Sequence, residues 1–198
     1  MIIHEHKAIF VHIPKTAGTS IECLFGINVS DDITLNQNTF TGWDGYKQMY
    51  IQHCSIQQIL DWSMMDLSNY FSFTFVRNPW DRIVSDYLFF KIRSDMSLKE
   101  FIVKEGVSDP THVLPQMYFI KKRNGEIGLD FIGRFENLQC DFNTVCDKIG
   151  IERQTLPHML KKQRKHYSFY YDDETVELIA KKYKEDIEYF GYEFENLK

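Results

Sequence analysis

The stretch Ala8–Ser20 reads AIFVHIPKTAGTS, and it passes from an apolar run through a short loop to two hydroxyl residues. The apolar run is typical of a buried strand, and Thr19 and Ser20 suit the start of a helix. A strand, a tight loop and a helix start together direct backbone N–H groups toward an anion. Lys15 adds a cation on a flexible stem within the loop. The stretch therefore predicts a cradle for a phosphate-like group.

The order of residues in this loop differs from that of the NTPase P-loop. That loop needs an upstream Gly and a Lys directly after its second Gly. Here Lys15 comes three residues before Gly18, and no Gly lies upstream in the loop. This order argues against an ATPase. A P-loop-type kinase that uses ATP on a small metabolite, and a nucleotide-binding module without turnover, stay open as alternatives.

Composition indicates a globular protein. The chain has 198 residues, 43% of them hydrophobic and 15% aromatic, which suits one domain with a sizeable core. The formal net charge of −5 argues against broad nucleic-acid binding. The sequence contains no apolar run of 18 residues, so we expect no membrane span. The first strand begins too near Met1 for a signal peptide. The four cysteines have no CxxC spacing, so we expect reduced thiols in a cytoplasmic protein.

Hydrophobic periodicity predicts the order of the strands and helices. We expect strands over residues 1–13, 72–76 and 131–135. We expect helices over residues 19–25, 56–62, 79–88, 98–105 and 138–149, and one long last helix from about residue 173 to 190. Residues 26–45 are polar and glycine-containing, which favours a loop beside an acceptor cleft. The alternation of strands and helices predicts an α/β fold.

A second strand–turn–helix unit carries two more candidate residues. Arg77 follows the strand over residues 72–76, and Ser85 lies eight residues further on, in a helix that Pro79 is suited to start. A guanidinium and a hydroxyl near one helix start suit a bidentate phosphate contact plus one hydrogen bond. The alternative is a surface salt bridge for Arg77 and a solvent-facing Ser85.

Two motifs carry a resemblance to a known family. Pro14–Ser20 resembles the 5′-phosphosulfate loop of sulfotransferases, enzymes that use 3′-phosphoadenosine 5′-phosphosulfate (PAPS). Phe75–Tyr87, FVRNPWDRIVSDY, resembles their 3′-phosphate motif, Arg-Asn-Pro-x-x-Arg-x-x-Ser-x-Tyr. The sequence of Phe10–Ser20 is similar to the corresponding loop of the carbohydrate branch, which includes heparan sulfate 2-O- and chondroitin or dermatan sulfotransferases. It differs from the Lys-x-Gly-Thr-x-Trp of the phenol and steroid branch.

The resemblance covers roughly residues 10–194. It implies a single P-loop-like domain over residues 1–198, with a central parallel sheet and helices on both faces. It also implies transfer of a sulfuryl group from PAPS to an acceptor hydroxyl, with a saccharide or glycoconjugate as the expected acceptor and with no metal. The lack of a predicted membrane anchor departs from the Golgi members, which favours a cytoplasmic enzyme of bacterial type.

The resemblance further implies roles for individual residues. Those expected at the 5′ end of PAPS are Lys15, Thr16, Ala17, Gly18, Thr19 and Ser20. Arg77 and Ser85 would hold the 3′-phosphate, and the late pair Arg164 and Lys165 is similar to a basic loop that closes over the nucleotide. Phe135, at a strand end, is expected beside the adenine, with a place in the core as the alternative.

The general base that takes the acceptor's proton is the least determined role. His53 lies between the two motifs, in the interval where the heparan sulfate 2-O- and cytosolic members carry their catalytic histidine. We therefore expect His53 and Lys15 to be the catalytic residues. Glu22 and His112 are the alternative bases and also candidates for contact with the acceptor. Their other interpretations are an acid near a helix N-terminus and a simple loop histidine.

Overall fold

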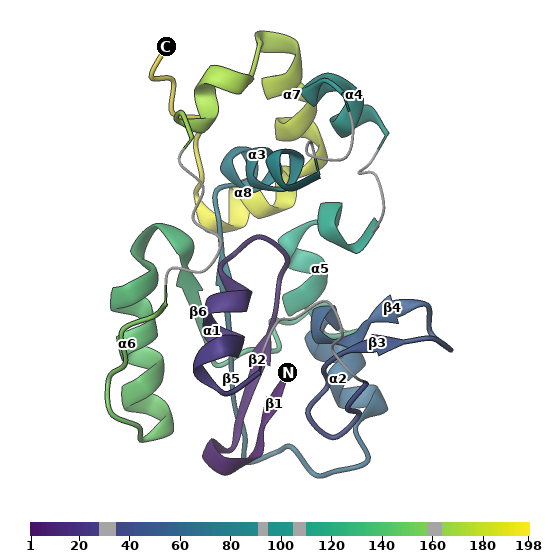
Figure 1. The fold of residues 1–198 in the computed structure, drawn as a ribbon, viewed down its shortest axis with the longest axis vertical. Helices are drawn as coiled ribbons and strands as arrows, with labels where there is room; N and C mark the ends of the chain where they lie inside the picture. Colours follow the sequence, from purple (N-terminus) through teal and green to yellow (C-terminus); the bar gives the residue numbers. More distant parts are fainter. Residues whose placement is uncertain (28–34, 91–94, 105–109, 158–163) are drawn as a thin grey trace. The chain divides into compact units, whose positions relative to one another are not determined.

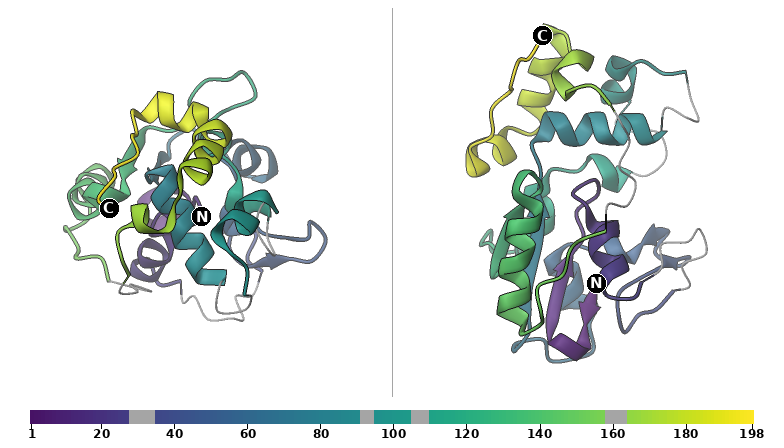
Figure 2. Two further views of the ribbon diagram at one scale, coloured as in Figure 1. Left: turned by 90° about the horizontal axis from the view of Figure 1, so that it is seen from above. Right: turned by 60° about the vertical axis from the view of Figure 1, so that its left-hand side comes forward.

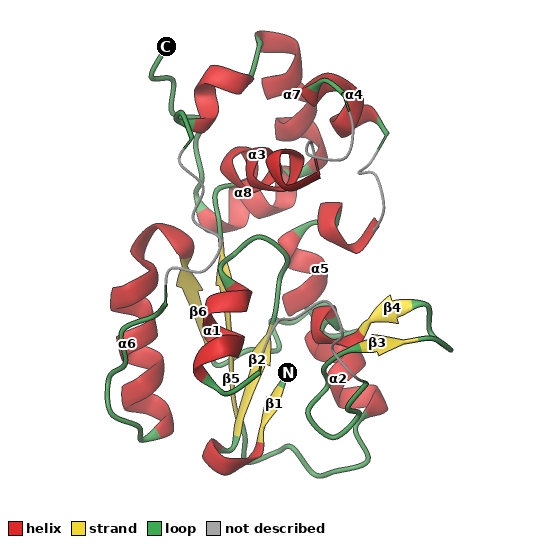
Figure 3. Ribbon diagram, in the orientation of Figure 1, coloured by secondary structure: helices red, strands yellow, loops and turns green. Residues whose placement is uncertain are grey.

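The computed structural model describes residues 1–27, 35–90, 95–104, 110–157 and 164–198 (Figure 1). Its contacts divide the chain into two compact units. Unit 1 comprises residues 1–76 and 118–160, and unit 2 comprises residues 77–117 and 161–198. Strands alternate with helices in unit 1, whereas the described residues of unit 2 form helices without strands (Figure 3). The single domain implied by the family resemblance stays a prediction.

Unit 1 is built on a four-stranded sheet with the strand order β1–β2–β5–β6. The strand bounds are Ile2–Ile3 for β1, Ala8–Val11 for β2, Phe71–Val76 for β5 and Phe131–Arg134 for β6. The pairings of β2 with β5 and of β5 with β6 are parallel, and β1 pairs with β2 antiparallel. Parallel strands joined through helices define an α/β fold, so the predicted fold class is confirmed.

The first strand differs from the prediction. A single strand over residues 1–13 was expected, but the chain turns back on itself within this range. A short 3₁₀ helix, η1 (His4–His6), follows β1, and Lys7 then adopts a positive φ of 45°. Ile2 consequently pairs with Ile9 across an antiparallel ladder. The polar residues between two short apolar runs form this reversal, which the overall hydrophobicity of the segment conceals.

Two helices cover one face of this sheet. The face carries Phe10 of β2 with Phe73 and Phe75 of β5, all fully buried. Ile21 of α1 (Gly18–Leu24) and Phe142 of α6 (Leu138–Ile149) belong to the same hydrophobic cluster. The predicted helix over residues 138–149 is therefore confirmed, and Gly150 ends it with a φ of 74°. Figure 2 shows α6 running alongside the strands.

The segment between β2 and β5 contains a helix that was predicted and a hairpin that was not. Helix α2 (Ile56–Trp62) begins with a capping box in which Ser55 and Gln58 exchange side-chain and backbone hydrogen bonds. In Figures 1 and 2 it lies on the opposite side of the strands from α6. The hairpin pairs β3 (Trp43–Asp44) with β4 (Met49–Tyr50), and its Trp43 and Tyr50 rings are in edge contact.

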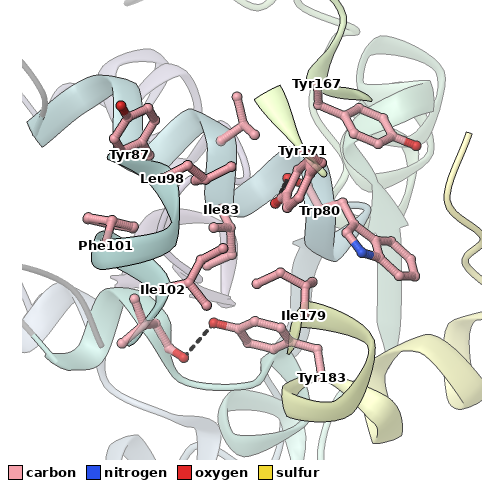
Figure 4. Packing of buried hydrophobic residues seen from close by; sticks show 12 residues of the cluster. Trp80, Ile83, Tyr87, Leu98, Phe101, Ile102, Tyr167, Tyr171, Ile179 and Tyr183 are labelled. Carbon is pink, nitrogen blue, oxygen red and sulfur yellow. Dashed lines mark hydrogen bonds between the residues drawn. The ribbon is translucent and has the colours of Figure 1, made fainter. Parts of the chain in front are cut away.

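Unit 2 is a cluster of helices around one aromatic core. Its longer helices are α3 (Pro79–Phe90), α4 (Leu98–Val103), α7 (Asp173–Lys182) and α8 (Lys184–Phe190). Figure 4 shows how side chains from α3, α4 and α7 meet around Ile83, Phe101 and Ile179. The buried tyrosines also satisfy their hydroxyls, since Tyr183 donates to the carbonyl of Val113 at 2.8 Å. The aromatic residues thus contribute both apolar area and fixed polar contacts.

The last helix also differs from the prediction. One helix over residues 173–190 was expected, whereas the chain forms α7 and α8 with a break at Tyr183. Tyr183 leaves the helical backbone conformation, with φ −107° and ψ 27°. Its ring is almost fully buried and its hydroxyl is bonded to Val113, so tertiary packing outweighs the continuous helical pattern. Gly191 ends α8 with a positive φ, as the sequence predicted.

None of the helices in the described part of the chain combines the length and the apolar character needed to cross a bilayer.

We expect Gly133→Ala to destabilise the protein. A Cβ at Gly133 would lie 2.5 Å from Cε1 of Phe75 and 3.1 Å from Cβ of Asp141. Because Phe75 is fully buried, overpacking should lower the free energy of unfolding by about 1–3 kcal/mol, as measured by urea denaturation. Gly45→Ala is the matched control, since the nearest atom to its added Cβ is 3.9 Å away. Equal stability of the two variants would contradict the packing of β5 against β6.

Candidate functional site

The loop that follows β2 has an unusual backbone conformation. Lys15 and Ala17, neither of them glycine, have φ angles of 69° and 75°. Ala17 occupies the N-cap of α1 in the left-handed conformation. Residues held in this sparsely populated region cost free energy, and such positions concentrate at ligand-binding sites. The conformation is therefore consistent with a loop shaped for a bound group.

Side chains fix the chain where it leaves β2. The carbonyl of Val11 accepts a hydrogen bond from Oγ1 of Thr74 at 2.6 Å, and the carbonyl of Ile13 accepts one from Oγ1 of Thr16 at 2.8 Å. Thr16 is fully buried, so its hydroxyl holds the loop's own backbone. Of the other residues predicted at the 5′ end, Ser20 is buried and Lys15 and Thr19 are half-buried.

A buried histidine lies beneath this loop. The Nδ1 atom of His12 is 2.8 Å from Oε1 of Glu22, and both side chains are buried. The ring of His12 stacks on Phe10 with a centroid distance of 5.7 Å. A Cβ at Gly18 would lie 2.0 Å from this ring, so glycine is required there by the close approach of the backbone. The His12 ring therefore packs directly against the loop at Gly18.

His53, the predicted base, lies in η2 (Ile51–His53) and contacts the same strand end. Its Nδ1 atom is 3.1 Å from the carbonyl oxygen of His12. The two imidazole rings are in edge contact with centroids 4.4 Å apart. The structure thus brings His53 beside the pair of His12 and Glu22, although 41 residues separate His53 from His12 in the sequence. His53 is buried, with 8% of its surface exposed.

Cys54, the residue after His53, does not offer a nucleophile. Burial raises the pKa of its thiol to about 12. The thiol is therefore protonated at physiological pH, whereas nucleophilic chemistry needs the thiolate. Among neighbouring groups, the Met1 ammonium donates to the carbonyl of Phe10 at 2.7 Å, and burial lowers its pKa to about 6.

In unit 2, Arg77 and Arg164, which were both predicted to bind the nucleotide, meet on one carboxylate. Arg77 donates from Nε and a terminal nitrogen to Oδ2 of Asp81, at 2.8 and 2.7 Å. Arg164 contacts the other oxygen, Oδ1, of the same Asp81. Ser85 lies one helical turn beyond Asp81 on α3 and is half-buried. Two positively charged groups thus meet at Asp81, and a hydroxyl lies one helical turn further along α3.

The backbone of Arg77 is held on both sides by Gln116. The amide N–H of Arg77 donates to Oε1 of Gln116 at 2.8 Å, and Nε2 of Gln116 donates to the carbonyl of Arg77 at 2.9 Å. Asp186 in turn accepts the backbone N–H groups of Gln116 and Met117 at 2.7 and 2.9 Å. Burial raises the pKa of Asp186, which those hydrogen bonds partly oppose. A buried polar chain therefore orients Arg77.

Lys165, the other late basic residue, lines an open hollow in unit 2. Its Nζ lies 5.9 Å from the centre of the Phe169 ring. The hollow has a volume of about 690 Å³, and its lining residues are Arg164, Lys165, Phe169 and Tyr170. Phe169 is 48% exposed, so an aromatic face is available beside two cationic side chains.

The structure gives His112 a partner within the protein. Its Nδ1 is 2.8 Å from Oδ1 of Asp86, and its ring is in edge contact with Phe90. Its backbone carbonyl accepts a hydrogen bond from the fully buried Arg82 at 2.8 Å. These contacts anchor the 3₁₀ helix η4 (Pro110–Val113) to α3. A contact of His112 or Glu22 with an acceptor stays a prediction.

Phe135 begins η5 (Phe135–Asn137), directly after β6. Its side chain is half-buried rather than part of the fully buried core. Its predicted position beside an adenine stays a prediction.

Sequence reasoning missed four of these residues: His12, Asp81, Gln116 and Asp186. His12 had a usable signal, because it continues the alternation of Ala8 and Phe10 onto the inward face of β2. Asp81 lies one turn after Arg77, which is a standard spacing for an ion pair. Gln116 and Asp186 have no local signal, since their contacts span 39 and 70 residues.

Comparison with known proteins agrees with the two motifs. The sequence model described as "Sulfotransferase family" matches residues 1–193. An uncharacterized protein from Archaeoglobus fulgidus is 39% identical over 89 residues, which cover 43% of this chain and 72% of that protein. The crystal structure of a sulfotransferase from Alicyclobacillus acidocaldarius is similar with a TM-score of 0.36 and 16% identity; the match covers 64% of this chain and 57% of the other. Because the family match spans nearly the whole sequence, this chain belongs to the sulfotransferase family.

Proposed function

We propose that this protein transfers a sulfuryl group from PAPS to a hydroxyl of a carbohydrate acceptor. The observation that carries the donor assignment is the convergence of Arg77 and Arg164 on Asp81. The sequence motifs assign both arginines to the nucleotide, and their common carboxylate partner brings the two guanidinium groups together. Guanidinium groups bind phosphate through paired, charge-assisted hydrogen bonds, which suits the 3′-phosphate of PAPS.

At the 5′ end, the proposed reaction needs positive charge where the leaving phosphate develops negative charge. The acceptor oxygen forms a bond to sulfur while the bond from sulfur to the bridging phosphate oxygen breaks, and 3′-phosphoadenosine 5′-phosphate (PAP) leaves. Lys15 and the backbone N–H groups of the loop over residues 15–20 are the groups that we assign to this charge. The positive φ angles of Lys15 and Ala17 support this assignment because they reflect a loop shaped in advance.

The acceptor hydroxyl must also lose its proton, and we assign this proton to His53. A carbonyl oxygen only accepts hydrogen bonds, so the contact with the carbonyl of His12 requires the proton of His53 on Nδ1. In the neutral ring, Nε2 then carries the lone pair that a general base needs. His53 would accept the proton as the oxygen attacks sulfur, and would release it to solvent after PAP leaves.

Asp81 gives the proposed 3′-phosphate site a specific electrostatic character. Its carboxylate carries one negative charge, while Arg77 and Arg164 together carry two positive charges. A positive charge therefore remains on the trio for a phosphate to neutralise, and Ser85 adds a hydroxyl one turn away. Lys165 and Phe135 complete the proposed nucleotide contacts, as cation and ring respectively.

We propose a carbohydrate acceptor because the sequence of residues 10–20 is similar to that of the carbohydrate branch of sulfotransferases. Acceptor identity, a role for His112 or Glu22 in binding the acceptor, and a cytoplasmic location stay predictions.

The donor assignment is tested by thermal denaturation with PAP, with ATP and Mg²⁺, and with buffer alone. A ligand that binds the folded state raises the melting temperature by an amount that grows with the ratio of its concentration to its Kd. We expect stabilisation by PAP and little by ATP and Mg²⁺, followed by transfer of radiolabelled sulfate from PAPS to saccharide acceptors. Stabilisation by ATP and Mg²⁺ but not by PAP would instead indicate the kinase alternative.

We expect Arg77→Ala to weaken PAP binding by about 1.5–3 kcal/mol, the range for a lost hydrogen bond to a charged group. Calorimetry should show little change for adenosine 5′-phosphosulfate, which has no 3′-phosphate. Arg153→Ala is the matched control, because Arg153 forms an exposed ion pair with Asp147 in unit 1. An equal loss of affinity for both nucleotides would show that Arg77 does not recognise the 3′-phosphate.

We expect His53→Ala to lower kcat by about 10²–10⁴ while PAP affinity stays near wild type. The wild-type rate should fall with falling pH, because a protonated imidazole ring cannot accept a proton. This acid limb should be absent from the residual activity of the variant. The exposed His4 provides the control, His4→Ala. Were the acid limb to persist in His53→Ala and vanish in His112→Ala, His112 would be the base.

A further inference from the structure

His12 and Glu22 form a buried polar pair that the proposed chemistry does not use directly. The Glu22 carboxylate has 2% of its surface exposed, and the His12 residue has 6%. Burial of a charged carboxylate is costly unless a hydrogen-bond donor compensates for it. Nδ1 of His12 is that donor, at 2.8 Å. Burial of the His12–Glu22 pair therefore carries a desolvation cost that apolar residues would avoid, which indicates a role beyond packing.

The ring of His12 is confined on three sides. Phe10 stacks on it with an interplanar angle of 16°, and His53 meets it edge to face at 4.4 Å between centroids. The Cα of Gly18 occupies the third side, where a Cβ would be only 2.0 Å from the ring atoms. The hydrogen bond to Glu22 fixes the rotation of the ring within this space. A change at Glu22 would therefore be transmitted to the neighbouring His53.

His12 also acts on His53 through its backbone. The carbonyl oxygen of His12 accepts the Nδ1–H of His53 at 3.1 Å, so one residue supplies both a ring contact and the hydrogen-bond acceptor. The ring of His12 packs against His53 while its carbonyl accepts the Nδ1–H of His53, so a displacement of His12 would disturb both contacts.

We propose that Glu22 and His12 are positioning residues that hold His53 in the Nδ1–H tautomer and in one orientation. This proposal rests on the proposed function, in which Nε2 of His53 is the general base. Glu22 holds the ring of His12, and His12 holds the ring and the Nδ1–H of His53. The wrong tautomer would carry its proton on Nε2 and could not accept one from an acceptor hydroxyl.

Met1 and Cys54 are further titratable groups near the pair. The Met1 ammonium interacts electrostatically with Glu22 and donates to the carbonyl of Phe10. Cys54, next to His53, is a neutral thiol because burial raises its pKa to about 12. Neither group supplies the hydrogen bond that holds the His12 ring. Glu22→Leu and Glu22→Gln both remove the charge that interacts with Met1, but only Glu22→Gln keeps an acceptor, so comparison of the two variants isolates that bond.

The first test is independent of turnover. Two-bond ¹⁵N–¹H correlation spectra of the whole protein report the tautomer of each histidine, with His12→Asn and His53→Asn used for assignment. We expect Nδ1–H on both His12 and His53 in wild type. Glu22→Leu should yield a mixture of tautomers for His53, and Glu22→Gln should restore the wild-type pattern because its amide oxygen still accepts from His12. An unchanged His53 tautomer in Glu22→Leu would overturn the proposal.

The second test is kinetic. Glu22→Leu should lower kcat by about 10-fold to 100-fold, the range for losing a partner that orients a functional histidine, with PAP affinity within about threefold of wild type. Glu22→Gln should recover most of this loss. The double variant His12→Phe with Glu22→Leu keeps a ring and leaves no unpaired polar group, so it guards against misfolding. Wild-type kcat in this folded double variant would overturn the proposal.

The two tests also separate this proposal from the proposed function. If wild type transfers no sulfuryl group from PAPS, the proposed function fails, while the spectra still decide whether Glu22 and His12 control the tautomer of His53. If wild type is active but the spectra and kcat of Glu22→Leu match wild type, the positioning proposal fails and the proposed function stands.

Discussion

The exit of β2 from the parallel sheet is the constraint on which the candidate site in unit 1 depends. Three successive carbonyls at this exit, those of Val11, His12 and Ile13, each accept a hydrogen bond from a different side chain. One donor belongs to β5, one to η2 and one to the loop itself. The strand end is therefore tied to three separate segments of unit 1, and the loop that follows starts from a fixed position and direction.

Parallel pairing has a second effect on the organisation of the chain. β2 and β5 are neighbours in register, with Val11 opposite Thr74, so their carboxyl ends point in the same direction. The phosphosulfate-type loop follows one of these ends, and the segment that begins with Arg77 follows the other. In α/β sheets, the residues that follow the carboxyl ends of the strands commonly bind the ligand. Each of the two sequence motifs thus directly follows the carboxyl end of a parallel strand.

Much of this organisation was predictable from sequence, for reasons that differ between elements. Helices α2 and α6 were predicted well because their caps, Ser55 and Gly150, are local signals. The nucleotide-binding roles of Arg77 and Arg164 were expected only through the family resemblance. Their meeting at Asp81 was not predicted, since 87 residues separate the two arginines in the sequence. The reversal at Lys7 and the break at Tyr183 were missed because both are decided by tertiary pairing and packing rather than by local propensity. The roles of Gln116 and Asp186 were missed for the same reason.

Because His12 and Gly18 are in close contact, we expect the residues at these two positions to vary together. Any side chain at position 18 would have to occupy the volume that the imidazole already fills. A relative with alanine at position 18 must therefore carry a smaller residue at position 12, and with it a different partner for the carboxylate at position 22. A change at position 18 should therefore be accompanied by changes at positions 12 and 22, so a designer who wishes to reshape this loop at Gly18 has to consider all three positions.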